Sequence, residues 1–117
     1  MAFSLSKTIQ QIKDITGYPV FATDMTKYEV ANHQTFLIYD EKGDIRKGSN
    51  ANQYLQDFVL SFVTRENVEV SEFDLIIGLQ PCGLIFRETQ KEYGRIADTD
   101  QEAKMVTFYF HQPLVVC

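Results

Sequence analysis

The stretch that decides the fold is Tyr54-Leu-Gln-Asp-Phe-Val-Leu-Ser-Phe-Val-Thr64. Read in alternation, Phe58, Leu60 and Phe62 fall on one side, and the positions between them mix polar and aliphatic residues. Successive side chains of a strand point to opposite faces, so this stretch predicts a strand with one strongly apolar face. A buried helix would not separate its polar residues with a period of two.

A second stretch, Lys104-Met-Val-Thr-Phe-Tyr-Phe-His111, repeats this alternation. Val106, Phe108 and Phe110 share one side, and less apolar residues share the other. Two long, aromatic strands, each buried on one side, predict an antiparallel sheet that is covered on one face.

Two helices are predicted from their end signals. The first begins at Ser4 or Ser6, either of which can cap it, and runs to about Thr16, where Gly17 can end it. The second starts at Ser71, where acidic residues suit the positive end of the helix dipole, and Pro81 closes it. The residues expected to pack this second helix on the sheet are Phe73, Ile76 and Ile77.

Two further strands complete the predicted sheet, at 34–39 and 83–89, with extended chain at 18–21. Gly43 lies in the turn after the first of them and is able to take a positive φ. The element order α-β-β-α-β-β predicts the α+β class: an antiparallel or mixed sheet of about four strands with two helices packed on one face. We expect a single domain over 1–117, in which 113–117 form a C-terminal tail.

Composition narrows the class of function. The 117 residues carry a net charge of −5, and the 11 basic residues are scattered, which argues against nucleic-acid binding. No apolar segment approaches the ~20 residues of a membrane span, and the N-terminus does not resemble a signal peptide. The sequence therefore predicts a soluble cytosolic protein that does not bind membranes.

No residue pattern indicates catalysis or a cofactor. His33 and His111 lack metal-ligand spacing, and Cys82 lies in a turn after a helix C-terminus, which raises a thiol pKa. The acidic run 98–102 lacks the turn glycine of a calcium loop, and the six glycines are isolated from one another. We therefore expect no enzyme activity, no metal and no cofactor.

The outer face of the predicted sheet is more apolar than a solvent-facing surface. Such a face needs cover, either from the N-terminal segment of the same chain or from a neighbouring subunit. Both alternatives are open at this stage. The residues assigned to this candidate oligomer interface are Leu37, Tyr39, Val59, Val63, Met105 and Tyr109.

Several local phrases, in this order along nearly the whole chain, resemble the tail terminator (tail completion, head-to-tail joining) proteins of long-tailed bacteriophages and prophages. The phrases are structural patterns without a catalytic signature. They are Ile15-Thr-Gly17, Gln34-Thr-Phe-Leu-Ile-Tyr39, Gln56-Asp-Phe-Val-Leu-Ser-Phe-Val-Thr64, Arg87-Glu-Thr-Gln-Lys-Glu-Tyr-Gly94, Asp98-Thr-Asp100 and Met105-Val-Thr-Phe-Tyr-Phe110.

The resemblance implies an α+β subunit of a homo-oligomeric ring, commonly a hexamer, that caps the tail tube. Its partners would be the tube protein and the head-completion or connector proteins. DNA would pass through the lumen without specific binding, and an acidic chain suits such a channel. The implied location is the virion tail or neck, after assembly in the host cytoplasm.

The resemblance also gives roles to two loops, Lys42–Gln53 and Lys91–Gln101, which would face tube, lumen or connector. The closest rival is another phage neck or minor capsid protein, such as a head-closure protein. A small cytosolic protein-binding module comes next, and an enzyme using Asp57 or Glu92 comes last. The exposed partner-facing residues are Lys42, Arg46, Lys47, Lys91, Glu92, Tyr93, Arg95, Asp98 and Asp100.

Overall fold

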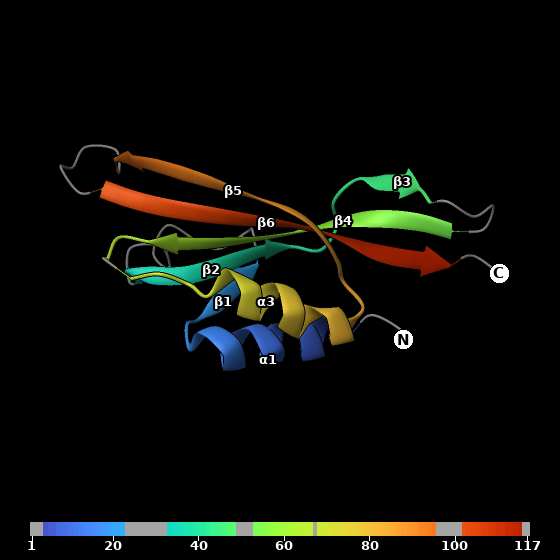
Figure 1. Cartoon of the computed structure of the whole chain (residues 1–117), viewed down its shortest axis with the longest axis horizontal. Coiled ribbons are helices and arrows are strands. Elements are labelled where there is room, and N and C mark those ends of the chain that lie inside the picture. Colours follow the sequence, from blue (N-terminus) through green and yellow to red (C-terminus); the bar gives the residue numbers. More distant parts are fainter. Residues whose placement is uncertain (1–3, 23–32, 49–52, 67, 96–101, 116–117) are drawn as a thin grey trace.

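The computed structural model describes residues 4–22, 33–48, 53–66, 68–95 and 102–115, and it belongs to the predicted α+β class (Figure 1). A short 3₁₀ turn, Gln80–Cys82, follows the second helix. The elements are α1 (Leu5–Thr16), β1 (Val20–Ala22), β2 (Thr35–Asp40), β3 (Ile45–Lys47), β4 (Gln53–Thr64), α3 (Glu72–Leu79), β5 (Ile85–Arg95) and β6 (Glu102–Val115).

The strands form one mixed sheet in the order β1-β2-β4-β6-β5. Only the β1–β2 pair is parallel, and β4 pairs with β6 along its whole length, from Gln53 opposite Val115 to Thr64 opposite Lys104. The other edge of β4 is shared, because β2 pairs with its second half and β3 with its first. The β4–β6 pair is therefore the spine of the molecule.

The sheet has six strands where about four were predicted, so the predicted strand count and order need correction. One addition, β1, comes from the segment expected to be extended. The other, β3, lies within a stretch expected to be a polar loop, and its three side chains are all exposed. A strand whose side chains are all exposed is held by backbone hydrogen bonds and does not alternate apolar with polar residues. Hydrophobic periodicity therefore could not predict β3.

The last two strands are longer than predicted. β5 continues to Arg95 through residues expected to form a loop, and β6 includes Pro113–Val115, which were expected to form a tail. The second half of β5 is polar on both faces, so it reads as loop although β6 pairs with it. Pro113 is tolerated because β5 begins at Ile85, opposite His111, which leaves β6 an edge strand from that point to its end.

Both helices lie on one face of the sheet, as predicted (Figure 1). Gly17 ends α1 with φ 75°, and its N–H donates to the Lys13 carbonyl at 2.8 Å. Ser71 is the N-cap of α3. No helix in the described part of the chain is long and apolar enough to cross a membrane.

The face of α3 that packs on the sheet differs from the predicted one. Leu75 and Leu79 are fully buried, whereas Phe73 is 75% exposed and Ile77 is 60% exposed. Two residues along a helix correspond to about 200° of rotation, so burying Leu75 and Leu79 turns Phe73 and Ile77 outward. Ile76 packs against the core, as expected.

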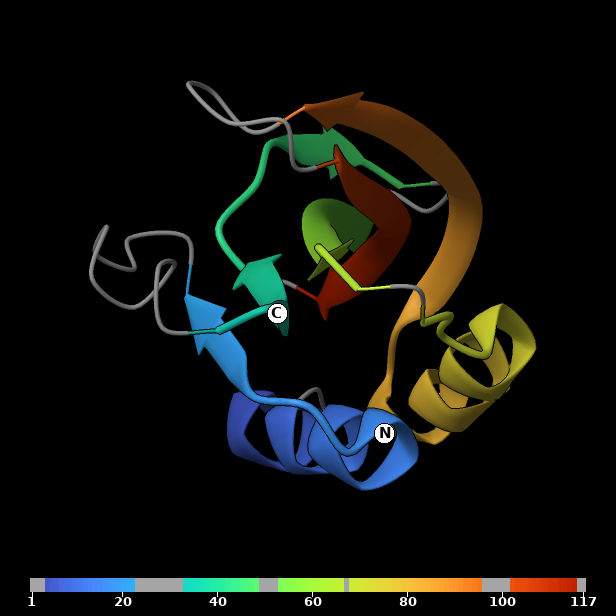
Figure 2. The same cartoon turned by 90° about the vertical axis from the view of Figure 1, so that its left-hand side faces the viewer.

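The core lies between the sheet and the helices. Phe58, Leu60, Phe62 and Phe108 are fully buried, which confirms the predicted apolar faces of the two long strands. Viewed along the long axis, the sheet curls above α1 and α3 (Figure 2). The core is therefore a layer of aromatic and aliphatic side chains between the helices and a twisted sheet.

The molecule is elongated, with extents of 51 × 25 × 23 Å and a radius of gyration of 15.2 Å. A compact chain of this length has a radius of gyration of about 13 Å. The excess length comes from an arm that projects beyond the helices (Figure 1). The arm consists of β3, Gln53–Gln56 of β4 and Gln112–Val115 of β6.

Candidate functional site

The outer sheet face, opposite the helices, carries a strip of half-buried apolar side chains. Val59 lies directly across from Tyr109, and Val63 directly across from Met105. Cross-strand neighbours of this kind touch on one face of a sheet, but the Ser61–Thr107 pair, with hydroxyls 3.3 Å apart, lies between the two apolar pairs. Phe36 lies opposite Val63 on the same face and is 2% exposed, so part of this face is covered within the chain. We call the four apolar residues Val59, Val63, Met105 and Tyr109 the outer strip.

Two residues predicted for this surface belong to the core instead. Leu37 pairs with Phe62 and is fully buried. Tyr39 pairs with Leu60, and its ring stacks on Phe58 with centroids 6.3 Å apart. Alternation within β2 was read correctly, but its phase relative to β4 depends on the pairing register, which the sequence does not contain. Leu37 and Tyr39 are therefore not interface residues.

A hollow of about 230 Å³ lies at the end of the outer strip nearest the arm. Arg46 comes from β3, Asp57 from β4 and His111 from β6. Asp57 Oδ2 is 3.4 Å from Arg46 Nη2, and Asp57 Oδ1 is 3.3 Å from His111 Nε2. The lining residues are Arg46, Asp57, Arg87, Glu88, Gln90, Tyr109, Phe110 and His111.

His111 is the buried titratable group of this hollow, with 9% of its surface exposed. Burial lowers its pKa below 6.5, and the charge of Arg87 lowers it further, whereas the carboxylate of Asp57 raises it. Arg46 makes a smaller contribution that also lowers the pKa. His111 is therefore neutral at pH 7.

Two groups compete for the same nitrogen of His111. Arg87 Nη1 lies 3.3 Å from Nε2, and Asp57 Oδ1 lies at the same distance. A neutral imidazole nitrogen either donates or accepts, so it serves one of these partners at a time. Nε2 of His111 can therefore alternate between Asp57 and Arg87.

Sequence reasoning missed Arg87. A register shift in β5 pairs Phe86 with Phe110 and Glu88 with Tyr109, so Arg87 is the extra residue of a β-bulge. Bulges re-aim a side chain, and here both Arg87 and Glu88 line the hollow. A weak signal exists in the sequence, because Phe86 and Thr89 share a face only if one residue is skipped.

The hollow brings charged and polar side chains together on the outer face of the sheet. The described residues that line it include no Ser, Thr or Cys that His111 could activate as a nucleophile. The Tyr109 hydroxyl donates to Gln90 Oε1 at 3.3 Å. Among the described residues, no three His, Cys, Asp or Glu side chains converge as a metal site requires.

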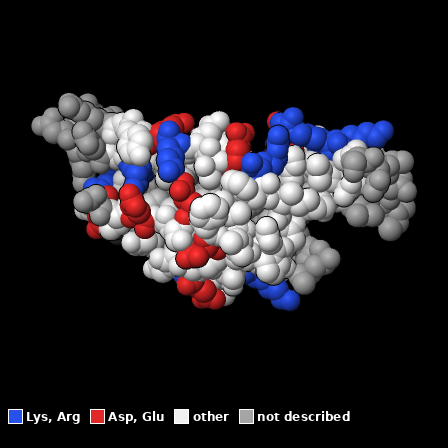
Figure 3. All heavy atoms as spheres, in the orientation of Figure 1, with Lys and Arg blue, Asp and Glu red and all other residues white. Residues whose placement is uncertain are grey.

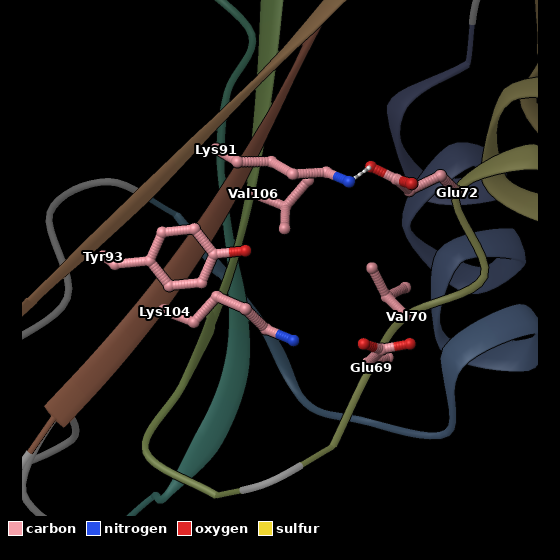
Figure 4. A pocket seen from close by; sticks show the side chains of 7 residues that line it. All are labelled: Glu69, Val70, Glu72, Lys91, Tyr93, Lys104 and Val106. Carbon is pink, nitrogen blue, oxygen red and sulfur yellow. Dashed lines mark ion pairs between the residues drawn. The ribbon is translucent and has the colours of Figure 1, made fainter.

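A second, smaller hollow lies between the sheet and the segment before α3 (Figure 4). Its volume is about 80 Å³, far below the roughly 300 Å³ of a small-molecule site. Lys91 pairs with Glu72 at 3.3 Å, and Lys104 Nζ donates to the Val68 carbonyl at 3.0 Å. These contacts tie the helical layer to β5 and β6, so we assign this hollow a structural role.

The predicted partner-facing residues fall in three places. Lys42 is exposed in the turn after β2, and Arg46 and Lys47 are in β3 of the arm. Lys91, Glu92 and Tyr93 are exposed, but they lie in strand β5 and not in a loop. Arg95 is the last residue of β5, and Asp98 and Asp100 lie outside the described residues.

Comparison with known proteins leaves the family open. No protein-family model matches this chain, and no curated protein matches it either.

Proposed function

We propose that this chain is a structural virion protein, a ring-forming tail terminator that caps the tail tube and offers the head-to-tail joining surface. The observation that carries the proposal is that the sheet extends beyond the helices that cover it. Its spine continues into the arm, where no described helix covers it (Figure 1). An elongated subunit with uncovered apolar surface is suited to assembly with other subunits.

The outer strip supplies one such surface. Val59, Val63, Met105 and Tyr109 are half-buried within the subunit, and both described helices lie on the other side of the sheet. Contact with another subunit would complete their burial, and each Å² of apolar surface removed from water contributes about 25 cal/mol. We assign the outer strip to the contact with a neighbouring subunit.

The charged ends of the sheet suit the other partners. The exposed side chains of Lys91, Glu92 and Tyr93 lie towards one end of β5–β6, and Arg46 and Lys47 lie on the arm at the opposite end. A ring that joins tube to connector needs contacts at two opposite ends. The net charge of −5 disfavours adhesion of DNA that passes through the lumen.

The proposal is tested by assembling the tail tube protein of the same phage with and without this chain. Electron microscopy should show shorter tubes, each closed at one end by a ring. Tubes of unchanged length that carry no bound chain would contradict the proposal. Binding to the portal of isolated heads, without any effect on tubes, would instead indicate a head-closure protein.

Substitution in the outer strip gives a matched test of the surface. Tyr109→Ser is expected to keep the far-ultraviolet circular dichroism of the folded chain and to lose ring formation. Lys13→Ala, on the exposed side of α1, is the control and should retain both. If Tyr109→Ser unfolds the chain, Tyr109 belongs to the intrachain core.

A further inference from the structure

Helix α3 presents exposed apolar side chains that are not part of the core of the described chain. Phe73 and Ile77 are four residues apart, so they lie on one side of the helix, and they are 75% and 60% exposed. Asp74 is exposed beside them. We call these three residues the α3 strip. Leu75 and Leu79 hold the opposite side of the helix in the core, so the α3 strip faces away from its own sheet.

The arm presents the complementary half, on the face that the helices cover elsewhere. Tyr54 and Gln56 alternate with Asp57 along β4, so they share the side of Phe58. By register, Ile45 and Lys47 join them from β3, and Leu114 joins them from β6. Ile45 is 60% exposed. We call this surface, Ile45, Lys47, Tyr54, Gln56 and Leu114, the arm underside.

The charges of the two surfaces are opposite. Helix α3 carries Glu72 and Asp74 and no basic residue, and Glu72 is already paired with Lys91. The described residues of the arm carry Arg46 and Lys47 and no acidic residue. In Figure 3, basic side chains lie over β3 and acidic side chains over the helical layer. Asp74 lies next to Phe73 on α3, and Lys47 lies on the same side of β3 as Ile45, whereas Arg46 lies on the other side.

We propose that the α3 strip of one copy of this chain packs against the arm underside of a second copy. The contact continues the packing of the subunit itself, in which aliphatic side chains of the two helices cover this same sheet face. Phe73 and Ile77 would serve as the anchors of a helix laid on an apolar surface, in apposition to Ile45 and Leu114. Asp74 would pair with Lys47.

The contact joins two different surfaces. After two copies have paired, the arm underside of the first and the α3 strip of the second are therefore still free to bind further copies. Such a head-to-tail contact repeats from copy to copy, and it gives a closed ring when the rotation between copies closes. This inference rests on the proposed function for closure, and it names the residues through which the ring subunits meet. It is distinct from the outer strip, which lies on the opposite face of the sheet.

Two variants separate the halves of the contact. Phe73→Glu blocks the α3 strip, and Ile45→Glu blocks the arm underside; both positions are exposed, so both variants should fold. Light scattering after size exclusion should show a closed multimer for the natural chain and no closed multimer for either variant alone, because the outer strip is then the one contact left between copies. An equimolar mixture of the two should give a larger species than either variant alone, since one intact pair of halves remains.

A control and a charge exchange sharpen the test. Tyr93→Glu changes a side chain that is also 75% exposed but lies outside both surfaces, so it should keep the mass of the natural chain. Asp74→Lys and Lys47→Glu should each reduce assembly. The double variant, which restores an opposite pair, should recover it.

Three results would overturn the contact: variants that assemble like the natural chain, a mixture that does not pair, or a natural chain that is monomeric at every concentration. The tube-length experiment decides the proposed function separately. If rings form and stop tubes while Phe73→Glu and Ile45→Glu have no effect, only this contact is wrong. If the mixture pairs but tubes keep growing, the contact stands and the tail-terminator function falls.

Discussion

At the scale of the residue, the buried aromatic rings carry the stability of the fold. Phe108 is fully buried and stacks on Phe110 with ring centroids 6.4 Å apart. We predict that Phe108→Ala costs about 3–5 kcal/mol in the free energy of unfolding, measured with denaturant, because it empties an aromatic core position. Tyr93→Ala, at a highly exposed ring, should stay within about 0.5 kcal/mol. A cost below about 1 kcal/mol for Phe108→Ala would mean that the strand faces are inverted.

The lowered pKa of His111 predicts a dependence of stability on pH. The pKa lies below 6.5 in the folded chain, so the unfolded chain takes up this proton first as the pH falls. The free energy of unfolding should therefore decrease as the pH drops through about 6.5 and below. Facing His111 are Asp57, Arg87, Arg46 and Glu88 of the hollow.

His111→Gln tests this dependence, because it removes the titrating group and keeps a polar side chain in the hollow. Between about pH 7.5 and 5.5, the variant should lose less stability than the natural chain. Thermal or denaturant unfolding across this window gives the comparison. Parallel curves for the two chains would show that His111 does not titrate differently on folding.

At this scale, alternation along each long strand predicted which of its side chains form the core. The faces of residues in β2 and β5 depend on how those strands align with their partners, and the sequence does not show this alignment. The apolar faces of 54–64 and 104–111 were correct because each strand carries its own period of two. Leu37 and Tyr39 were misplaced because their face depends on how β2 aligns with β4. Arg87 was missed because it occupies a bulge in β5.

At the scale of the element, the turn between β2 and β3 positions the arm. Gly43 could take a positive φ in this turn, but among the described glycines only Gly17 and Gly83 have one. Gly43 is needed for close approach instead: its N–H donates to the Asp57 carbonyl at 3.2 Å, and Asp57 N–H donates to the Asp44 carbonyl at 2.9 Å. This turn therefore holds the strand that carries Asp57.

We predict that Gly43→Ala destabilises the chain by about 1–3 kcal/mol, the cost of inserting atoms into packed structure. A Cβ at this position would lie 2.6 Å from the Asp57 carbonyl oxygen, which is backbone and cannot rotate away. Gly94→Ala is the control, because a Cβ there meets nothing within 4 Å. Equal unfolding midpoints for the two variants would contradict this account of the turn.

Some helices and strands could be predicted from the sequence, and others could not. Both helices were found from caps and proline, which act locally. β3 and the second half of β5 were missed because exposed polar strands are held by backbone pairing with a distant partner. The outward side of α3 was misassigned because three apolar residues, Phe73, Ile76 and Ile77, do not by themselves indicate which side of the helix meets the sheet.

At the scale of the whole molecule, shape and surface point to assembly. The sheet is longer than the helices that cover it (Figure 1), and the described residues of the arm carry basic and no acidic side chains, which lie over β3 in Figure 3. The α3 strip and the arm underside lie at separate places on each subunit, so both can be occupied at once. A monomeric binding module would need neither an uncovered arm nor two complementary apolar surfaces.

The mass of the chain in solution, measured by light scattering after size exclusion over a wide range of concentration, tests this account most directly. A ring-forming tail terminator should give a closed multimer near six times 13.5 kDa that does not grow further as the concentration rises. A monomer at every concentration, or an aggregate that grows without limit, would contradict the proposed ring.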